Sequence, residues 1–276
     1  MTGVRIRGLR KSFRSLTRRT HVLQGVDLDV EPGQVVGLIG PNGAGKTTLM
    51  SCLLGFLHAD SGEVSIDGRP ADDIDVRRRI GFVPERMNFG RRATSQAFLR
   101  YMARLSKADV ARVEALLSKL DVAHGARKRL SEHSRGMLQR VGMAQALLGE
   151  PDYLFLDEPA SGLDPNGVLL VRDLILEQKE RGRAVLLNSH QLSEVEKVCD
   201  RVYFLDRGVI GREETLRHDT TIPIAITLLD GQTVELDVGS EEEIAAVVGR
   251  MVGEGARIIE VRRRTADLEG MFRSGR

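Results

Sequence analysis

The sequence predicts an α/β fold with a mostly parallel sheet, an all-helical insertion and a small appended α+β module. Three observations support this prediction. Short apolar runs of strand length alternate with segments of helical periodicity through most of the chain. Residues 94–120 keep a helical spacing with no strand among them. After about Leu216 the chain changes character and returns to strand-length runs joined by a turn signal.

The first part of the chain is expected to supply strands around one short helix. Alternation of apolar and polar residues predicts half-buried strands, and a wholly apolar run predicts a buried one. Glu31-Pro32-Gly33 supplies a turn before that buried strand. The expected strands are Val4–Leu9, Val22–Val30, Val35–Ile39, Glu63–Ile66 and Arg79–Val83, and the expected helix is Leu49–Leu57.

The middle of the chain is expected to be helical and then to return to alternating strands and helices. The spacing predicts helix from Thr94 to about Leu120 and again over Met137–Leu148. Strands are then expected at Tyr153–Leu156, Ala184–Leu187 and Val202–Leu205, with helices at Val168–Arg181 and Gln191–Cys199. Strands that alternate with helices favour a parallel sheet.

The last part of the chain predicts a separate small module. Asp230-Gly231 between Ile222–Leu229 and Thr233–Val238 is a strong hairpin signal. Ser240–Glu243 matches a capping box for a helix that ends near Gly253 or Gly255. A strand at Ile258–Val261 and a short helix at Thr265–Phe272 follow. We expect one domain over residues 1–213 and the module over residues 214–276.

The composition fits folded domains with an aliphatic core. Of 276 residues, 41% are hydrophobic and only 4% aromatic. No apolar run approaches the roughly 20 residues that span a bilayer, and no signal-peptide pattern is present, so we expect a cytoplasmic location. Cys52 and Cys199 fall within apolar helical patterns and are interpreted as reduced core thiols.

The charge is unevenly distributed. Residues 77–140 hold 16 Lys/Arg against 5 Asp/Glu, a local charge of +11 in a chain of net charge +2. One interpretation is a solvated helical face. The other is a surface that faces lipid headgroups, an acidic partner or nucleic acid. Charge alone does not choose between them.

A glycine-rich loop follows the apolar strand Val35–Ile39 and leads into a helix. Its residues are Gly40, Pro41, Asn42, Gly43, Ala44, Gly45, Lys46, Thr47 and Thr48. This is the P-loop pattern G-x-x-x-x-G-K-[ST], whose backbone N–H groups and helix N-terminus cradle a polyphosphate. Lys46 is expected to reach the β- and γ-phosphates, Thr47 the Mg²⁺, and Thr48 a further phosphate oxygen. The sequence therefore predicts nucleotide binding.

Two adjacent carboxylates, Asp157 and Glu158, follow the apolar run that begins at Tyr153. In parallel sheets ligands bind at the carboxyl ends of the strands. We expect Asp157 to orient the Mg²⁺ shell and Glu158 to act as general base toward an attacking water.

Three further polar segments accompany the P-loop and the carboxylate pair. Ser134 and Gly136 open the helical run before the strand and can offer donors to a phosphate. Asp164 ends the segment Ser161-Gly162-Leu163-Asp164. His190 follows the next strand and is expected to reach the γ-phosphate site.

Together these segments resemble the nucleotide-binding ATPase subunit of an ABC transporter, over roughly residues 3–213. Gly40–Thr48 is similar to Walker A, Ser134–Gln139 to the signature motif and Leu154–Glu158 to Walker B with its catalytic glutamate. Ser161–Asp164 resembles the D-loop, and His190 the switch histidine. The resemblance implies a P-loop NTPase fold: a RecA-like core with an antiparallel β subdomain and a helical subdomain at about residues 86–135.

The resemblance also implies roles for two residues outside these motifs and shows two departures. Phe13 falls where the family places an adenine-stacking aromatic, although core packing is an alternative and Ser15–Thr20 looks like a short insertion. In the signature motif, Arg135 and Met137 replace the usual glycine and glutamine, as in subfamilies that serve exporters. Glu85 stands where the family generally has glutamine, and it is expected to bind nucleotide and Mg²⁺.

The implied mechanism is a cycle of ATP-driven dimerisation. Two copies are expected to pack head to tail, with the P-loop of one facing Ser134 and Gly136 of the other, so that ATP binding and hydrolysis close and open the dimer. Lys46, Glu158 and His190 would carry catalysis, with ATP and Mg²⁺ as cofactors.

The partner would be a polytopic membrane permease of the ABC-2 exporter type, received by the helical subdomain. Arg91 and Arg92 are candidates for pairing with its acidic surface. The ATPase would then sit at the inner face of the membrane, with no nucleic acid expected.

Two other functions are alternatives to an exporter subunit. A soluble ABC ATPase acting on nucleic acid or ribosomes would use the +11 segment to bind backbone phosphates. The chain has one cassette, no coiled-coil insertion and no zinc-ligand cysteines, which disfavours that function. A catalytically silent regulatory subunit is disfavoured because Lys46, Asp157, Glu158 and His190 are all present.

Overall fold

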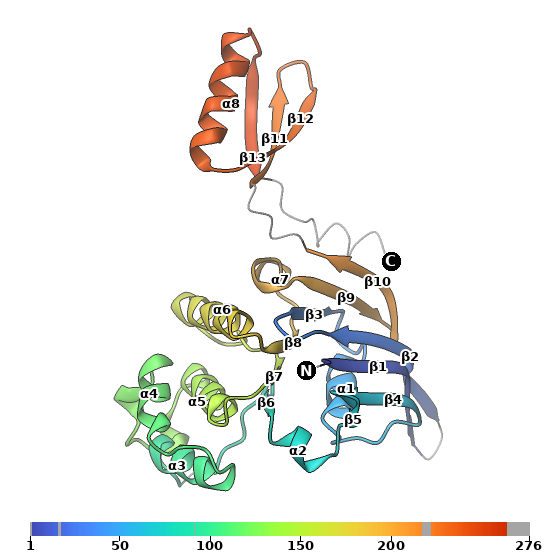
Figure 1. Ribbon diagram of the computed structural model, residues 1–276, viewed down its shortest axis with the longest axis vertical. Helices are drawn as coiled ribbons and strands as arrows, with labels where there is room; N and C mark the ends of the chain where they lie inside the picture. The colour runs from blue at the N-terminus through green and yellow to red at the C-terminus, as the bar shows by residue number, and fades with distance from the viewer. Residues whose placement is uncertain (1, 16–17, 91, 217–221, 264–276) are drawn as a thin grey trace. The chain divides into compact units, whose positions relative to one another are not determined.

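A six-stranded sheet forms the centre of the first of two units in the computed structural model (Figure 1). The structure describes residues 2–15, 18–90, 92–216 and 222–263. The chain divides into Met1–Glu214 and Thr215–Arg276, which are described separately. The strand order is β10-β9-β3-β8-β7-β6, and the pairs β9–β3, β3–β8, β8–β7 and β7–β6 are parallel. The bounds are β3 Val35–Ile39, β6 Ile80–Val83, β7 Tyr153–Asp157, β8 Ala184–Asn188, β9 Arg201–Asp206 and β10 Val209–Thr215.

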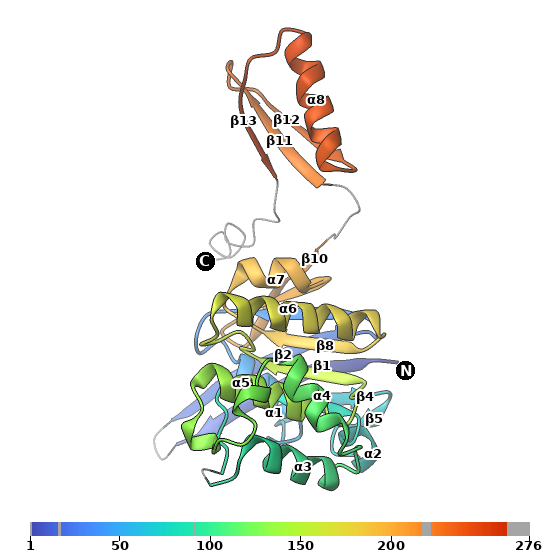
Figure 2. The ribbon, with the colours of Figure 1, turned by 90° about the vertical axis from the view of Figure 1, so that its left-hand side faces the viewer.

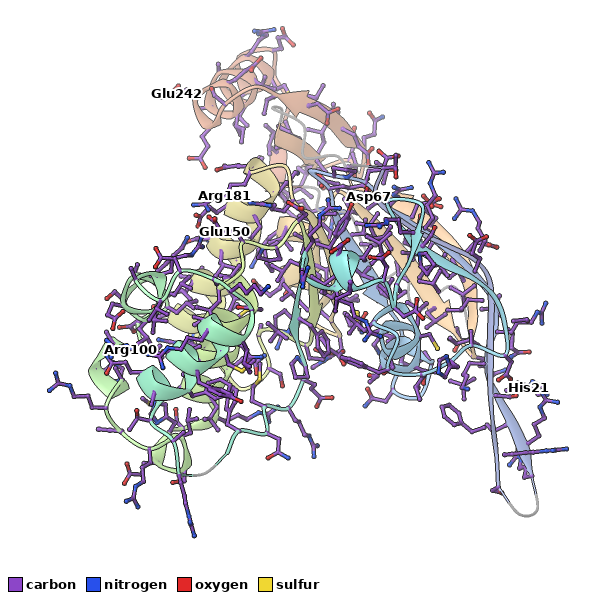
Figure 3. The ribbon with its side chains drawn as sticks, turned by 60° about the horizontal axis from the view of Figure 1, so that its bottom comes forward. His21, Asp67, Arg100, Glu150, Arg181 and Glu242 are labelled. Carbon is purple, nitrogen blue, oxygen red and sulfur yellow. The ribbon has the colours of Figure 1, made fainter. Side chains whose placement is uncertain are left out.

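A second, antiparallel sheet of the first unit has the strand order β2-β1-β4-β5. Its strands are β1 Val4–Arg14, β2 Arg19–Val30, β4 Ser61–Ile66 and β5 Arg69–Pro70. The strands β1 and β2 extend beyond their predicted ends and form a long hairpin, on which His21 lies near the tip (Figure 3). Helix α1, Lys46–Leu53, packs between the two sheets and contributes Leu49, Met50 and Leu53 to a continuous apolar core.

The helical insertion lies on one side of the parallel sheet, with the antiparallel sheet on the other (Figure 1). It comprises α3 Ser95–Leu105, α4 Arg112–Lys119, α5 Arg135–Leu147 and 3₁₀ turns at Ala123–Gly125 and Leu130–Glu132. The helical spacing predicted from Thr94 to about Leu120 falls on two helices, α3 and α4. The chain turns between them at Lys107, whose φ is +57°, and Asp109 accepts from the Ala111 N–H at 2.9 Å just before α4 begins. Neither glycine nor proline marks this turn in the sequence.

Two helices cover the parallel sheet on the side seen in Figure 2: α6 Pro165–Glu180 and α7 Leu192–Val198. Helix α6 begins earlier than predicted because Asp164 caps it and Pro165 occupies its first turn. Helix α1 also begins and ends earlier than predicted, at Lys46 and Leu53. The short helix α2, Ile74–Arg77, and the strands β5 and β10 were not predicted.

The second unit is a three-stranded antiparallel sheet with one helix. The strand order is β12-β11-β13, with β11 Ile222–Leu228, β12 Thr233–Val238 and β13 Ile258–Arg263. Helix α8, Glu241–Gly253, packs over a small core that includes Ile224, Ile226 and Val238. Ser240 caps α8 as predicted, but the Glu243 carboxylate accepts from the Gly239 N–H at 2.6 Å rather than from Ser240. The predicted helix Thr265–Phe272 lies outside the described residues.

Cys52 and Cys199 are both buried, in agreement with their interpretation as core thiols. Within the described ranges, none of the helices combines the length and the apolar character that crossing a membrane requires.

Candidate functional site

The P-loop connects β3 to α1 and is held tightly by the backbone around it. A side chain at Gly40 would meet the Leu205 carbonyl oxygen, because a Cβ there would lie only 2.2 Å from it. Gly45 caps α1 with a φ of +113°, a backbone conformation that glycine adopts without strain. The loop therefore needs glycine at both positions to bring its N–H groups to the N-terminus of α1.

Lys46 folds back over the loop. Its Nζ donates to the Gly40 carbonyl at 2.6 Å and to the Pro41 carbonyl at 3.2 Å. Burial lowers the pKa of Lys46, and the negative charges of Glu158, Asp157 and Glu85 only partly oppose that effect. The ammonium group is thus held in a partly dehydrated position, where it interacts strongly with an anion.

Asp157 ends β7 and is buried beside the P-loop. Its Oδ1 accepts from Asn188 Nδ2 at 3.0 Å, and its Oδ2 lies 3.4 Å from the Thr47 hydroxyl, which donates to it. Burial raises the pKa of Asp157, whereas these two hydrogen bonds act to lower it. The amide oxygen of Asn188, Oδ1, is buried and has no hydrogen-bond partner among the residues that the structure describes.

Glu158 directly follows β7 and has a φ of +51°, which is unusual for a residue with a side chain. Its backbone is fixed by a bond from its N–H to the Asn188 carbonyl at 3.0 Å. Its carboxylate Oε2 lies 2.7 Å from Nδ1 of His190, which follows β8. The carboxylate is mostly buried and the imidazole mostly exposed, so His190 presents its far side to solvent.

A cavity of about 320 Å³ lies at the carboxyl ends of the strands and is lined by Lys46, Thr47, Asp157 and Glu158, whereas His190 contacts Glu158 without being part of the lining. The cavity brings together the P-loop residues 42–48, Glu85, Asp157 and Glu158. Val22 on β2 also lines it and was not predicted. The only signal at Val22 is its place in an alternating strand, which does not indicate a ligand. The volume and the surplus of carboxylates near one lysine suit a polyphosphate that arrives with a cation.

The remaining predicted residues lie outside that cavity. Ser134 caps α5, where its Oγ accepts from the Met137 N–H at 3.2 Å, and Gly136 follows in the first turn. Asp164 caps α6 by accepting from the Gly167 N–H at 3.2 Å. Phe13 is 43% exposed on the β1–β2 hairpin, with Lys11 Nζ 5.5 Å from its ring centre. An exposed Phe13 is not a core residue, so the packing alternative does not hold.

The chain matches known proteins along most of its length. Residues 23–161 match the family described as ABC transporter. An uncharacterized ABC transporter ATP-binding protein of Synechocystis sp. is 37% identical over 249 residues, which is 87% of this chain and 68% of that protein. A fluoroquinolones export ATP-binding protein of Mycobacterium tuberculosis is 35% identical over 224 residues, 80% of this chain and 73% of that protein.

Solved structures agree with these matches. A dimeric post-hydrolysis ATP-binding cassette bound to ADP and Pi has a TM-score of 0.71 and 25% identity, and the likeness covers 78% of this chain and 100% of that one. The P-loop NTPase fold expected from the resemblance is confirmed. The chain therefore belongs to the ABC transporter family, in which it is an ATP-binding and ATP-hydrolysing subunit.

Proposed function

We propose that this chain powers an exporter whose membrane-spanning subunit is a separate polytopic protein, and that the cavity at the P-loop is its ATPase site. The observation that carries the proposal is the convergence of Lys46, Asp157 and Glu158 in one cavity, with His190 bonded to Glu158. The relative from Mycobacterium tuberculosis, named as a fluoroquinolones export protein, supports the direction of transport.

Mg²⁺ would be held jointly by the protein and the nucleotide. Among the described residues no group of three or more His, Cys, Asp or Glu side chains forms a metal cage. Thr47 and Asp157, whose oxygens lie 3.4 Å apart, and Glu85 on the cavity wall supply oxygen donors. Mg²⁺ prefers such sites, where waters and phosphates complete its shell. Bound there, it would neutralise charge on the β- and γ-phosphates.

Glu158 would act as the general base. Its carboxylate faces the P-loop cavity, and the Nδ1 contact from His190 fixes its orientation. Lys46 would move from the carbonyls of Gly40 and Pro41 onto the phosphates, since those carbonyls are weaker partners for an ammonium than a phosphate anion.

Four predicted residues would contact nucleotide in a dimer. The nucleotide bound by a second copy would be contacted by Ser134, Gly136 and Asp164, and the adenine bound by the same copy by Phe13. The first three lie outside the P-loop cavity, at the N-termini of α5 and α6. Helix N-termini attract phosphate, so these residues suit a head-to-tail dimer that closes over ATP.

The helical insertion would receive the membrane partner. Helix α3 exposes Tyr101 and Leu105, each 60% exposed and one helical turn apart, and Phe56 at the end of α1 is 66% exposed. Exposed large apolar side chains of this kind mark interaction surfaces. Arg92, on the segment before α3, is exposed, whereas Arg91 lies outside the described residues.

The test uses Glu158→Gln, which should bind ATP but lose at least ~100-fold in turnover, because a positioned base contributes 10²–10⁴. With ATP it should run as a dimer in size-exclusion chromatography. The same protein is then used as bait on detergent-solubilised membranes, with the double variant Lys46→Ala/Glu158→Gln as the control whose ATP binding is weakened.

ATP-dependent capture of a polytopic membrane protein by the single variant supports the exporter. Capture of ribosomal or nucleic-acid-bound proteins without a membrane protein contradicts it. Retained turnover in Glu158→Gln would remove Glu158 from the role of base.

A further inference from the structure

Arg135, the basic residue within the signature motif, makes a contact with the D-loop of its own chain. It is the first residue of α5, and its Nη2 donates to the Ser161 hydroxyl at 2.7 Å. Its aliphatic stem lies across Gly162, where an added Cβ would be 2.8 Å from Arg135 Cδ. Gly162 has a φ of +77°, so both the space and the backbone there require glycine.

A second arginine holds the other end of the same loop. Arg140, further along α5, donates from Nη2 to Asp164 Oδ1 at 3.0 Å and from Nη1 to Asp121 Oδ2 at 2.9 Å. Its side chain is only 12% exposed. The same Asp164 oxygen also caps α6 through the Gly167 N–H. Arg140 therefore fixes the point where the loop enters α6.

Between these two arginines the loop and the helix lie close together. A Cβ at Gly136 would lie 3.4 Å from Leu163 Cδ2 and 3.5 Å from the Gly162 carbonyl oxygen. The start of the loop is also tied to the base, because the Ser161 N–H donates to the Glu158 carbonyl at 3.0 Å. One continuous set of contacts thus joins the α5 N-terminus to the backbone of Glu158.

We propose that Arg135 is a positioning residue that holds the D-loop, Ser161–Asp164, against the start of α5. The two segments that would face the partner copy then move as one unit and keep Glu158 in its orientation. Without this bond the start of the loop keeps the bond from the Ser161 N–H to the Glu158 carbonyl. The proposal rests on the head-to-tail dimer of the proposed function.

The test is a double-mutant cycle on ATP hydrolysis with Arg135→Ala, Ser161→Ala and both together. Each single variant should lower kcat about tenfold, the loss expected for one hydrogen bond from a charged donor. The double variant should lose no more than either single variant, because both remove the same contact. The KM for ATP should stay unchanged, since the P-loop holds the nucleotide. Arg135→Lys, which keeps the stem and a donor, should recover most of the rate.

The matched control is Arg127→Ala, an exposed arginine of the same subdomain, which should leave kcat and the melting temperature unchanged. Losses that multiply in the double variant would overturn the proposal. A raised KM with Arg135→Ala and no effect of Ser161→Ala would also overturn it, because Arg135 would then touch the partner's nucleotide directly.

Dimerisation of Glu158→Gln separates this proposal from the proposed function. If that variant forms an ATP-dependent dimer and the losses multiply, only the role of Arg135 is wrong. If it stays monomeric with ATP, the head-to-tail dimer is wrong, and the role of Arg135 is lost with it.

Discussion

Lys46 shows how a single residue prepares the site for its ligand. The ammonium group is partly dehydrated and donates to the carbonyls of Gly40 and Pro41. Burial lowers the pKa of Lys46, and the nearby carboxylates oppose that shift. A phosphate that replaces those carbonyls gains a charge-assisted contact without first stripping water from the lysine.

Lys46→Ala should therefore weaken ATP binding by roughly 10–100-fold, because a hydrogen bond to a charged group contributes about 1.5–3 kcal/mol. Isothermal titration calorimetry with ATP and Mg²⁺ measures the change. Lys128→Ala, at an exposed position of the helical insertion, serves as the control. An unchanged Kd in Lys46→Ala would exclude a phosphate contact by this side chain.

Asp157 lowers the stability of the nucleotide-free protein at neutral pH. Its pKa is raised in the folded protein, chiefly by burial, so its charged form is favoured more in the unfolded chain. Its contribution to stability is present at acidic pH and is lost as the pH rises through the folded pKa. Asp157→Asn should then raise the Tm of the nucleotide-free protein near neutral pH, and the gain should shrink toward about pH 4.

Thermal unfolding across that pH range measures the gain, and Asp173→Asn, an exposed aspartate on α6, provides the comparison. The same Asp157→Asn variant should lose the extra thermal stability that Mg²⁺ adds to the ATP-bound wild type. A Tm gain of Asp157→Asn that grows as the pH falls would contradict this prediction.

At the scale of elements, Asp67 joins strands that are distant in sequence. It lies in the β4–β5 turn with a φ of +53° and accepts from the N–H groups of Thr2 and Gly3 (Figure 3). Arg79, just before β6, donates to it at 2.8 Å and also to Asp152 before β7 at 2.6 Å. The turn therefore connects the antiparallel sheet to the parallel one.

Asp67→Asn should destabilise the protein at neutral pH by on the order of 2 kcal/mol. Burial alone would raise the pKa of Asp67, but the nearby Tyr153 phenol, the Thr2 N–H and the Arg79 guanidinium lower it to about 2. A carboxylate whose pKa is lowered stabilises the folded protein at pH values above its pKa in the unfolded chain. This stability is lost as the pH falls toward about 2. Denaturant unfolding at neutral and acidic pH should show the deficit narrowing with acid. Asparagine tolerates a positive φ, so the turn itself is retained.

The elements also show which signals the sequence carries and which it lacks. The strands β3, β7 and β8 are wholly buried, and their uninterrupted apolar runs predict them closely. The turn at Lys107 is hard to predict because neither glycine nor proline marks it. The helix α2 spans four residues and is set by the Asp73 cap, too short for any periodicity to appear.

In the site, too, some features have a sequence signal and others have none. Lys46, Thr47, Asp157 and Glu158 follow strands that a parallel sheet aligns, so their convergence in one cavity could be predicted from strand order alone. Val22 reaches the cavity from the other sheet, and only the packing of the two sheets brings it there. The bond between Arg135 and Ser161 likewise depends on how α5 packs beside α6, which no local pattern encodes.

At the scale of the whole molecule, the basic helical insertion uses part of its charge in exposed salt bridges of its own. One example is the pair Arg100–Glu114 at 2.5 Å, of which Arg100 is labelled in Figure 3. Exposed pairs of this kind contribute only 0–1 kcal/mol each. The apolar pair Tyr101 and Leu105 is thus the stronger basis for recognition of a membrane partner, since burying such side chains contributes about 1.5–3 kcal/mol each.

Tyr101→Ser with Leu105→Ser should therefore abolish capture of the membrane partner while leaving basal ATP hydrolysis within about twofold, because both side chains already face solvent. Capture with the Glu158→Gln bait, followed by quantitative mass spectrometry, measures the loss. Leu169→Ser on α6, 44% exposed but outside the helical insertion, is the matched control and should capture normally. Equal capture by both variants would place the docking surface elsewhere and leave the basic side chains of the insertion, Arg92 first among them, to account for recognition.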